Sequence, residues 1–217
     1  MEKERYLSGA YEPRTSEEMR QYYDRWAEVY DIELTENAYQ QPRRCAEALT
    51  RSISDPRNAR VLDAGCGTGL SGLALVEAGF LHIDGCDFSK AMLEKAFETG
   101  IYSKLFVTDL NCPPLDTPNA TYDAVTAVGI FSFGHVGPDA LDEFVRVVKP
   151  GGLIVVGLNE KYFEEGSIAR KLDELKRKGK LEEVSREHGD HIPGTGLSGW
   201  VIVSRNTLQP ERDAPTP

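Results

Sequence analysis

The stretch at residues 61–70, Val-Leu-Asp-Ala-Gly-Cys-Gly-Thr-Gly-Leu, constrains the fold of this chain more than any other. An apolar run, typical of a buried strand, leads directly into glycines at positions 65, 67 and 69. From Leu70 the apolar residues follow helical spacing as far as Gly79. Glycine permits both a tight turn and the close approach of another molecule to the backbone. This order predicts a site where backbone N–H groups face the anionic part of a nucleotide-like cofactor.

The rest of the chain alternates strand and helix patterns. After a first strand that begins at about Arg60, we expect strands at residues 83–87, 105–107, 123–128 and 153–158. The intervening helices begin at Leu70, after the capping Ser89 and after Pro138, and the second of them is expected to face inward with Met92, Leu93, Ala96 and Phe97. A charged helix at residues 160–178 and two strands at 182–187 and 199–204 follow. The alternation predicts an α/β fold with a doubly wound, mostly parallel seven-stranded sheet and helices on both faces.

Three regions are expected along the chain. Residues 1–54 form an N-terminal arm and helical cap, residues 55–205 form the cofactor-binding domain, and residues 206–217 form a disordered tail rich in proline and charge. Thr15 and Glu18 form a capping box for a helix that runs to about Asp31, and a second helix runs from about Pro42 to Ile53. The first helix carries an aromatic face of Tyr22, Tyr23, Trp26 and Tyr30, which suits a lid over the cofactor. A helix packed permanently on the sheet is the alternative.

Charge and cysteine content exclude several classes of function. The formal net charge of the 217 residues is −10, which argues against binding nucleic acid or an anionic membrane through bulk charge. The four cysteines have no CxxC spacing, so we expect free thiols and no zinc site. Neither an apolar leader nor an apolar run of membrane length is present. We therefore expect a cytoplasmic protein, monomeric or dimeric, with a small-molecule or protein substrate.

The glycine stretch distinguishes between two cofactor families. A dinucleotide fingerprint has the spacing GxGxxG, and here the third glycine falls one residue early. Together with Asp63, which is expected at the mouth of the turn, the glycines resemble the (D/E)xGxGxG signature of class I S-adenosylmethionine (SAM)-dependent methyltransferases. This resemblance implies that Gly65, Cys66, Gly67 and Gly69 pack against the methionine part of SAM. It also implies that Asp63 helps to hold the ammonium group.

Acidic residues at two strand ends extend this pattern. Asp87 ends the second strand, and a carboxylate there accepts hydrogen bonds from both ribose hydroxyls in NAD enzymes and methyltransferases alike. The resemblance further implies that Asp109 reaches the adenine amino group, although both acids are also compatible with solubilising loop residues. The other residues assigned to the cofactor are those that flank the adenine or belong to the lid: Phe88, Met92, Leu110, Val128, Tyr23, Trp26 and Tyr30.

Two further segments narrow the resemblance. The turn at residues 149–153, Lys-Pro-Gly-Gly-Leu, is a frequent class I feature. Residues 23–31, Tyr-Asp-Arg-Trp-Ala-Glu-Val-Tyr-Asp, and the run from Gly79 to Leu93 are similar to the small methyltransferase-like proteins named after the Williams–Beuren syndrome region. The resemblance covers roughly residues 55–160 and these N-terminal residues.

His135 is the candidate for acceptor chemistry. It lies in the segment at residues 129–135 that ends the fourth strand, where acceptors lie in this fold. It is a candidate general base or acceptor-orienting group, although a structural or an exposed histidine also fits the sequence. His188-Gly189-Asp190-His191 is a second histidine cluster, which we expect to be a solvated polar loop without a metal.

The sequence therefore predicts a class I methyltransferase that moves the methyl group of SAM to a small-molecule or protein acceptor. One alternative is an NAD(P)-linked oxidoreductase, which the glycine spacing and Asp63 disfavour. The other is a SAM-binding protein without turnover, because methyl transfer chiefly needs alignment and requires no obligatory catalytic residue.

Overall fold

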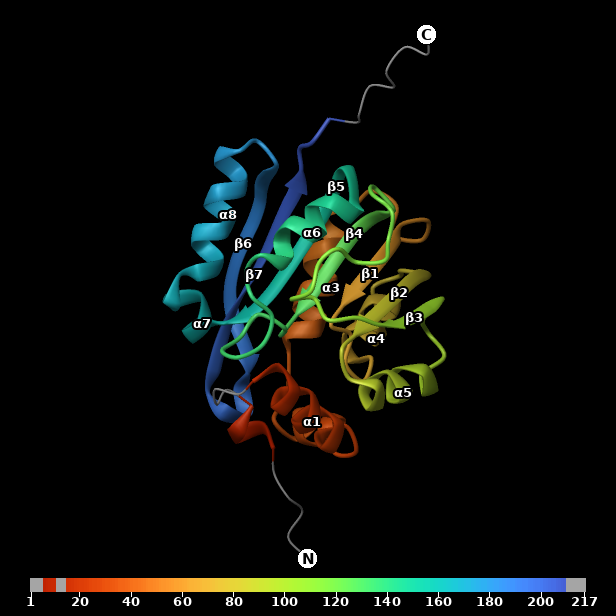
Figure 1. Cartoon of the computed structure of the whole chain (residues 1–217), viewed down its shortest axis with the longest axis vertical. Helices are drawn as coiled ribbons and strands as arrows, with labels where there is room; N and C mark the ends of the chain where they lie inside the picture. Colours follow the sequence, from red (N-terminus) through yellow and green to blue (C-terminus); the bar gives the residue numbers. More distant parts are fainter. Residues whose placement is uncertain (1–5, 11–14, 210–217) are drawn as a thin grey trace, which may run out of the picture.

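A seven-stranded sheet organises the chain (Figure 1). The computed structural model describes residues 6–10 and 15–209. The strand order is β3-β2-β1-β4-β5-β7-β6, and only β7 runs antiparallel to its neighbours. The predicted α/β fold is confirmed. The strands are β1 (Arg60–Ala64), β2 (His82–Asp87), β3 (Lys104–Val107), β4 (Tyr122–Val128), β5 (Val148–Asn159), β6 (Leu181–Ile192) and β7 (Leu197–Asn206).

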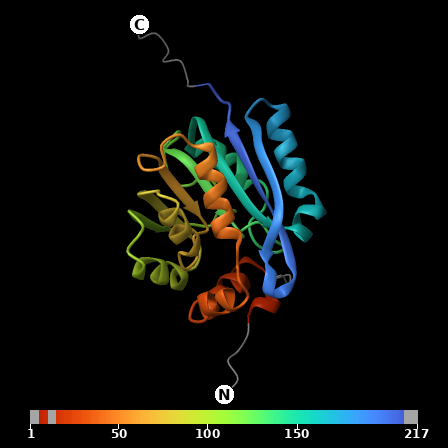
Figure 2. The same cartoon turned by 180° about the vertical axis from the view of Figure 1, so that it is seen from behind.

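Helices cover both faces of this sheet. Figure 2 shows α3 crossing the face opposite to the one that α6 and α8 cover in Figure 1. The helices are α1 (Ser16–Trp26), α2 (Tyr30–Glu36), α3 (Gln41–Ser52), α4 (Leu70–Glu77), α5 (Lys90–Glu98), α6 (Ala140–Val147), α7 (Glu160–Glu165) and α8 (Ser167–Arg177), with 3-10 turns η1 (Leu7–Gly9) and η2 (Pro193–Thr195).

The two faces have separate apolar cores. Side chains alternate along β5, so that Ile154 and Val156 join one buried cluster and Leu153 and Val155 join the other. A strand segment buried on both faces is expected to be apolar, as residues 153–158 of β5 are. The chain order reverses between β1 and β4, where parallel strands leave a crevice at their carboxyl ends.

Helices α1 and α2 form a cap at this end of the sheet (Figure 1). Thr15 and Glu18 form the expected capping box at the start of α1. Tyr22 and Trp26 are buried in a small cluster of the cap, separate from both sheet cores. Ser89 caps α5 by accepting a hydrogen bond from the Met92 amide, as predicted.

Several element boundaries differ from the prediction. The helix expected at residues 15–31 ends at Trp26, and α2 begins at Tyr30. The break brings the rings of Trp26 and Tyr30 into an edge contact at 4.6 Å between centroids. The helix expected at 160–178 is divided at Gly166, whose φ of +92° is left-handed and therefore cannot continue an α-helix.

Three further expectations about packing are wrong. The helix after Pro138 ends at Val147, because the chain turns into β5 five residues earlier than predicted. β6 and β7 are both longer than predicted, since they pair with each other as far as residues 192 and 197. Phe97 is 77% exposed, whereas Met92, Leu93 and Ala96 of the same helix are buried. Phe97 therefore lies on the solvent face of α5.

Candidate functional site

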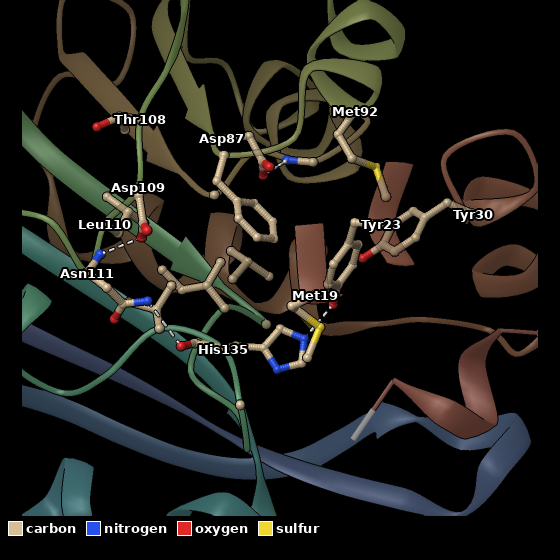
Figure 3. Close-up of a pocket in the computed structure, with 18 residues that line it drawn as sticks. Met19, Tyr23, Tyr30, Asp87, Met92, Thr108, Asp109, Leu110, Asn111 and His135 are labelled. Atoms are coloured by element: carbon tan, nitrogen blue, oxygen red, sulfur yellow. Dashed lines mark hydrogen bonds between the residues drawn. The ribbon is translucent and has the colours of Figure 1, made fainter. Parts of the chain in front are cut away.

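A pocket lies at the carboxyl ends of β1, β2 and β4, under the cap (Figure 3). Its cavity volume is about 80 Å³. The structure brings together, in the lining of this one pocket, most of the residues that the sequence assigned to it: Tyr23, Tyr30, Gly65, Gly67, Asp87, Phe88, Met92, Asp109, Leu110, Val128 and His135.

Asp87 places a buried carboxylate in the pocket. Its Oδ2 accepts a hydrogen bond from the Gly67 amide at 3.0 Å, and its Oδ1 accepts one from the Ser89 amide at 2.9 Å. Burial raises the pKa of this carboxyl to about 6, against the opposing effect of these amide hydrogen bonds. Each carboxylate oxygen has capacity for a further hydrogen bond, so the group can accept from two ligand hydroxyls.

The glycine turn exposes backbone to the same cavity. Gly65 and Gly67 both have left-handed φ values, +69° and +54°. A Cβ on Gly65 would collide with Ile130, whereas a Cβ on Gly67 would meet nothing within 4 Å. The space beside Gly67 is therefore a cradle that a side chain would fill, which is the geometry that a ligand close to the backbone requires.

Asp63 lies inside the domain and not at the mouth of the turn, so that expectation is wrong. Its carboxylate is 0% exposed and accepts hydrogen bonds from the hydroxyls of Ser71, Tyr102 and Thr126. Burial raises the pKa of the Asp63 carboxyl. The three donors come from α4, from the chain before β3 and from β4, so Asp63 braces the elements that carry the glycine turn.

Three other predicted residues lie behind the pocket. Cys66 is buried against Leu93 and Ala96. Gly69 lies close to Thr99 and Tyr102 and begins α4 with a φ of +104°. Trp26 is 2% exposed within the cap cluster, and its Nε1 has no hydrogen-bond partner among the described residues.

Seven further residues line the pocket that the sequence did not indicate as site residues. The Asn111 side chain donates to the His135 carbonyl at 3.2 Å and accepts from the Gly137 amide at 2.8 Å, so it fixes the loop after β4 (Figure 3). Met19 lies four residues before Tyr23, a spacing that places both on one face of a helix and was available from the sequence. The missed lining residues are Met19, Thr108, Asn111, Gly129, Ile130, Gly134 and Val136.

His135 joins the core to the cap. Its Nε2 lies 2.8 Å from the Tyr23 hydroxyl (Figure 3). Its Nδ1 lies 2.9 Å from the Phe133 carbonyl oxygen. Two further hydrogen bonds of 2.5 Å join the cap to the core: Ser89 donates to Asp24 and Thr68 donates to Asp31. We call these three hydrogen bonds the cap contacts.

The second histidine cluster is not a solvated loop. Residues 188–191 belong to β6, and His191 is buried against Tyr39. Burial lowers the pKa of His191 to about 4. Within the described ranges, no group of three His, Cys, Asp or Glu residues is arranged to hold a metal ion.

All four cysteines are free, and Cys112 is the exposed one. Of the helices in residues 6–10 and 15–209, none is long and apolar enough to cross a membrane.

Comparisons with known proteins point to one enzyme class. A family model described as "Methyltransferase domain" matches residues 61–152. Human Methyltransferase-like protein 27 is 38% identical over 167 residues, which cover 74% of this chain and 67% of that protein. A phosphatidylethanolamine N-methyltransferase of Cereibacter sphaeroides is 32% identical over 68% of this chain and 70% of its own length. A demethylmenaquinone methyltransferase of Bacillus licheniformis is 36% identical over 58% of this chain and 56% of its own.

Solved structures share the fold at low sequence identity. The [4+2]-cyclase SpnF has a TM-score of 0.66 and 18% identity, with 91% of this chain and 98% of that one covered. The complex of the Haloferax volcanii Trm112 methyltransferase activator with a putative methyltransferase gives a TM-score of 0.61 and 19% identity. The match covers 83% of this chain and 96% of that one. Because SpnF is a cyclase, the fold by itself does not fix the reaction.

Proposed function

Because this chain belongs to the class I SAM-dependent methyltransferases, we propose that the pocket under the cap binds SAM and presents its methyl group to an acceptor beside His135. The similarity to Methyltransferase-like protein 27 confirms the family and the narrower resemblance. The enzyme class and the cofactor follow from the family. The residue assignments below and the identity of the acceptor are proposals.

The observation that carries the assignment is the arrangement of Asp87 beside Gly67. A buried carboxylate and a glycine with open space next to it line one wall of the cavity. A ribose with two hydroxyl donors fits such a carboxylate, and its neighbouring atoms fit the cradle beside the glycine turn. SAM supplies an electrophilic methyl group when bound, and these residues hold and orient it.

The adenine is assigned to the next part of the lining. Asp109 and Leu110 follow β3, and Phe88 and Met92 follow β2, so the four residues approach one space from two strand ends. We propose that Asp109 accepts from the adenine amino group and that the apolar side chains, with Val128, pack on the ring. Aromatic and aliphatic walls with few polar groups are typical of such sites.

We propose that the cap is a lid. The closed cavity measures about 80 Å³, whereas small-molecule sites commonly occupy roughly 300–1,000 Å³. We therefore propose that α1 and α2 move away from the glycine turn and α5 when SAM enters. The three cap contacts, together with an ion pair at 3.4 Å between Glu28 of the cap and Lys95 of α5, join the cap to the core and would have to break for this movement. A cap packed permanently on the sheet is the alternative.

The relatives suggest two kinds of acceptor. By their names, one acts on demethylmenaquinone and another on phosphatidylethanolamine, and both molecules have apolar bodies. We propose a small molecule in preference to a protein side chain, because the cap covers the acceptor end of the pocket. We further propose that the protein works in the reducing cytoplasm, which the four free cysteines support.

Calorimetric titration tests this proposal. The wild-type protein is expected to bind SAM and not NAD, which separates the methyltransferase from the oxidoreductase. Asp87→Ala is expected to weaken SAM binding by at least about tenfold, because hydrogen bonds to a charged group contribute roughly 1.5–3 kcal/mol each. Asp116→Ala, which removes an exposed carboxylate outside the pocket, is the matched control. Near-normal SAM affinity in a folded Asp87→Ala protein would refute the assignment of the pocket.

A further inference from the structure

The hydrogen bond between Tyr23 and His135 joins two segments that are 112 residues apart. Tyr23 belongs to α1 of the cap, and His135 belongs to the loop after β4. Both side chains line the pocket, where they point toward each other in Figure 3. A closed cap therefore completes a pair of ionisable groups that neither segment supplies alone.

The second contact of His135 fixes the direction of this hydrogen bond. A carbonyl oxygen can only accept, so the Nδ1 that lies 2.9 Å from the Phe133 carbonyl carries a proton. In a neutral imidazole the other nitrogen, Nε2, is then an acceptor. The Tyr23 hydroxyl must therefore donate to Nε2. The Tyr23 phenol oxygen can also accept a hydrogen bond, and Tyr23 lines the pocket. A hydroxyl group of a ligand can therefore donate to the Tyr23 oxygen.

We propose that Tyr23 and His135 form a proton relay, and that the methyl acceptor is a small molecule with a hydroxyl group. This inference rests on the proposed function. The acceptor O–H gives its proton to the Tyr23 oxygen as Tyr23 gives its own proton to Nε2 of His135. The acceptor oxygen forms the new bond to the methyl carbon, and the sulfonium sulfur keeps the electron pair of the bond that breaks. The products are a methyl ether, a neutral thioether and an imidazolium, so charge is conserved.

The chemistry of the alternatives favours a hydroxyl. A thiol has a pKa near 8.5 and ionises appreciably without help, so it gains little from a relay. An ammonium would bring a second positive charge close to the sulfonium, and like charges at short range repel. A neutral hydroxyl adds no charge on arrival and is a poor nucleophile until its proton leaves. It is therefore the acceptor that a neutral proton-accepting pair serves best.

The surroundings of the pair indicate an acceptor with an apolar body. Met19, Ile130 and Val136 line the cavity near His135. The Tyr23 ring is held between aromatic neighbours: it stacks on Trp26 at 5.5 Å and meets Phe88 edge-on at 6.0 Å. Phenylalanine at position 23 keeps this packing, so Tyr23→Phe removes the relay hydroxyl alone.

The experiment compares phenol, whose hydroxyl needs a base, with 4-nitrophenol, whose hydroxyl does not, and uses an amine and a thiol as probes of other acceptor atoms. Phenol, benzylamine, thiophenol and 4-nitrophenol are offered with methyl-labelled SAM at a pH where only the nitrophenol hydroxyl is largely ionised. The wild type is expected to label the oxygen of phenol. Tyr23→Phe and His135→Gln are expected to lower transfer to phenol by about 100-fold or more, the scale of general-base catalysis, and transfer to 4-nitrophenol by less than about threefold. Tyr22→Phe removes a cap hydroxyl bonded to the Tyr6 carbonyl, outside the pocket, and serves as the matched control.

A second readout does not depend on turnover. Nitrogen NMR of the histidines is expected to show the Nδ1–H tautomer for His135, with an Nε2 shift that changes in Tyr23→Phe and not in Tyr22→Phe. An Nε2–H tautomer would overturn the relay.

Equal losses of methyl transfer to phenol and to 4-nitrophenol in Tyr23→Phe would show that Tyr23 has only a structural role. Transfer only to the amine or the thiol, to a ring carbon, or to none of the probes by a protein that binds SAM in calorimetry would overturn the hydroxyl acceptor. Absence of SAM binding would instead refute the proposed function.

Discussion

At the scale of single residues, Asp87 couples the pocket to pH. Its carboxylate is 8% exposed, and burial raises its pKa to about 6. Ribose hydroxyls donate more strongly to the ionised form. SAM affinity is therefore expected to fall as the pH falls through about 6, by up to about tenfold per pH unit. Calorimetry from pH 5 to pH 8 measures this, and Asp87→Asn is expected to abolish the dependence. A wild-type affinity that is flat across this range would contradict the role of Asp87.

The raised pKa of Asp87 affects folding stability in the opposite direction: a higher pH favours SAM binding but lowers the stability of the fold. Because the folded pKa of Asp87 is raised, its contribution to stability is fully present below the unfolded pKa of about 3.9 and is lost as the pH rises through about 6. In thermal unfolding without ligand, Asp87→Asn is thus expected to stabilise the protein at pH 8 and to have little effect at pH 4. A stabilisation that is equal at both pH values would show that the carboxyl is not the cause.

Substitutions at Gly67 and Gly179 distinguish the effect of backbone strain from the effect of contact with the ligand. Gly67 and Gly179 both have left-handed φ values, +54° and +66°, and a Cβ on either meets nothing within 4 Å. Alanine at each position is expected to cost a similar stability, about 1–2 kcal/mol, because L-residues are strained there. Only Gly67→Ala, which fills the cradle in the pocket, is expected to weaken SAM binding, and Gly67→Val is expected to abolish it. Tight binding of SAM by soluble Gly67→Val would show that the ligand does not approach this turn.

At the scale of elements, the proposed lid movement concerns the cap of α1 and α2. Trp26 is buried between Tyr6 and Tyr23, and its Nε1 finds no partner among the described residues, which costs roughly 1–3 kcal/mol in the closed form. Under the proposed lid movement, a rearrangement within the cap that exposes Trp26 to water would relieve this cost. Closing around a ligand would exclude water from the reacting atoms.

Tryptophan emission tests this movement. In Trp200→Phe, Trp26 is the single remaining tryptophan, and its emission is expected to change when SAM or its demethylated product is added. Protease cleavage within residues 15–36 is expected to slow at the same time. Thr68→Val, which removes the contact to Asp31, is expected to speed cleavage without ligand, whereas Thr50→Val on α3 is not. Unchanged emission and cleavage at saturating ligand would leave α1 and α2 as fixed scaffold.

At the scale of the whole molecule, ligand binding and folding are linked. The pocket is built from the glycine turn, three strand ends and the cap, so an unfolded chain has no equivalent site. SAM at 100 times its Kd is expected to stabilise the fold by about 2.7 kcal/mol, which raises the Tm of a chain of this size by roughly 5–10 °C. Thermal unfolding measures the shift. NAD at the same concentration is expected to leave the Tm unchanged, and a shift with NAD alone would favour the oxidoreductase.

The amino-acid sequence by itself determined the class of fold and the position of the pocket. Both rest on local signals: the glycine turn, the apolar strands, the capping Ser89 and the polar residues that follow strand ends. Parallel strands place such ends at one edge of the sheet, so Asp87, Asp109 and His135 were predictable neighbours without any coordinates. The enzyme class also followed, because the family signature is contiguous in the chain.

Only the tertiary structure decided which of these residues face the cavity. Asp63 turns inward because Ser71, Tyr102 and Thr126, from three different segments, supply its donors. Phe97 stays exposed, although the residues one and four positions before it on α5 are buried. The Tyr23–His135 pair depends on the angle between cap and sheet. Burial and hydrogen-bond partners of this kind come from residues distant in the chain, and no local pattern encodes the distance between them.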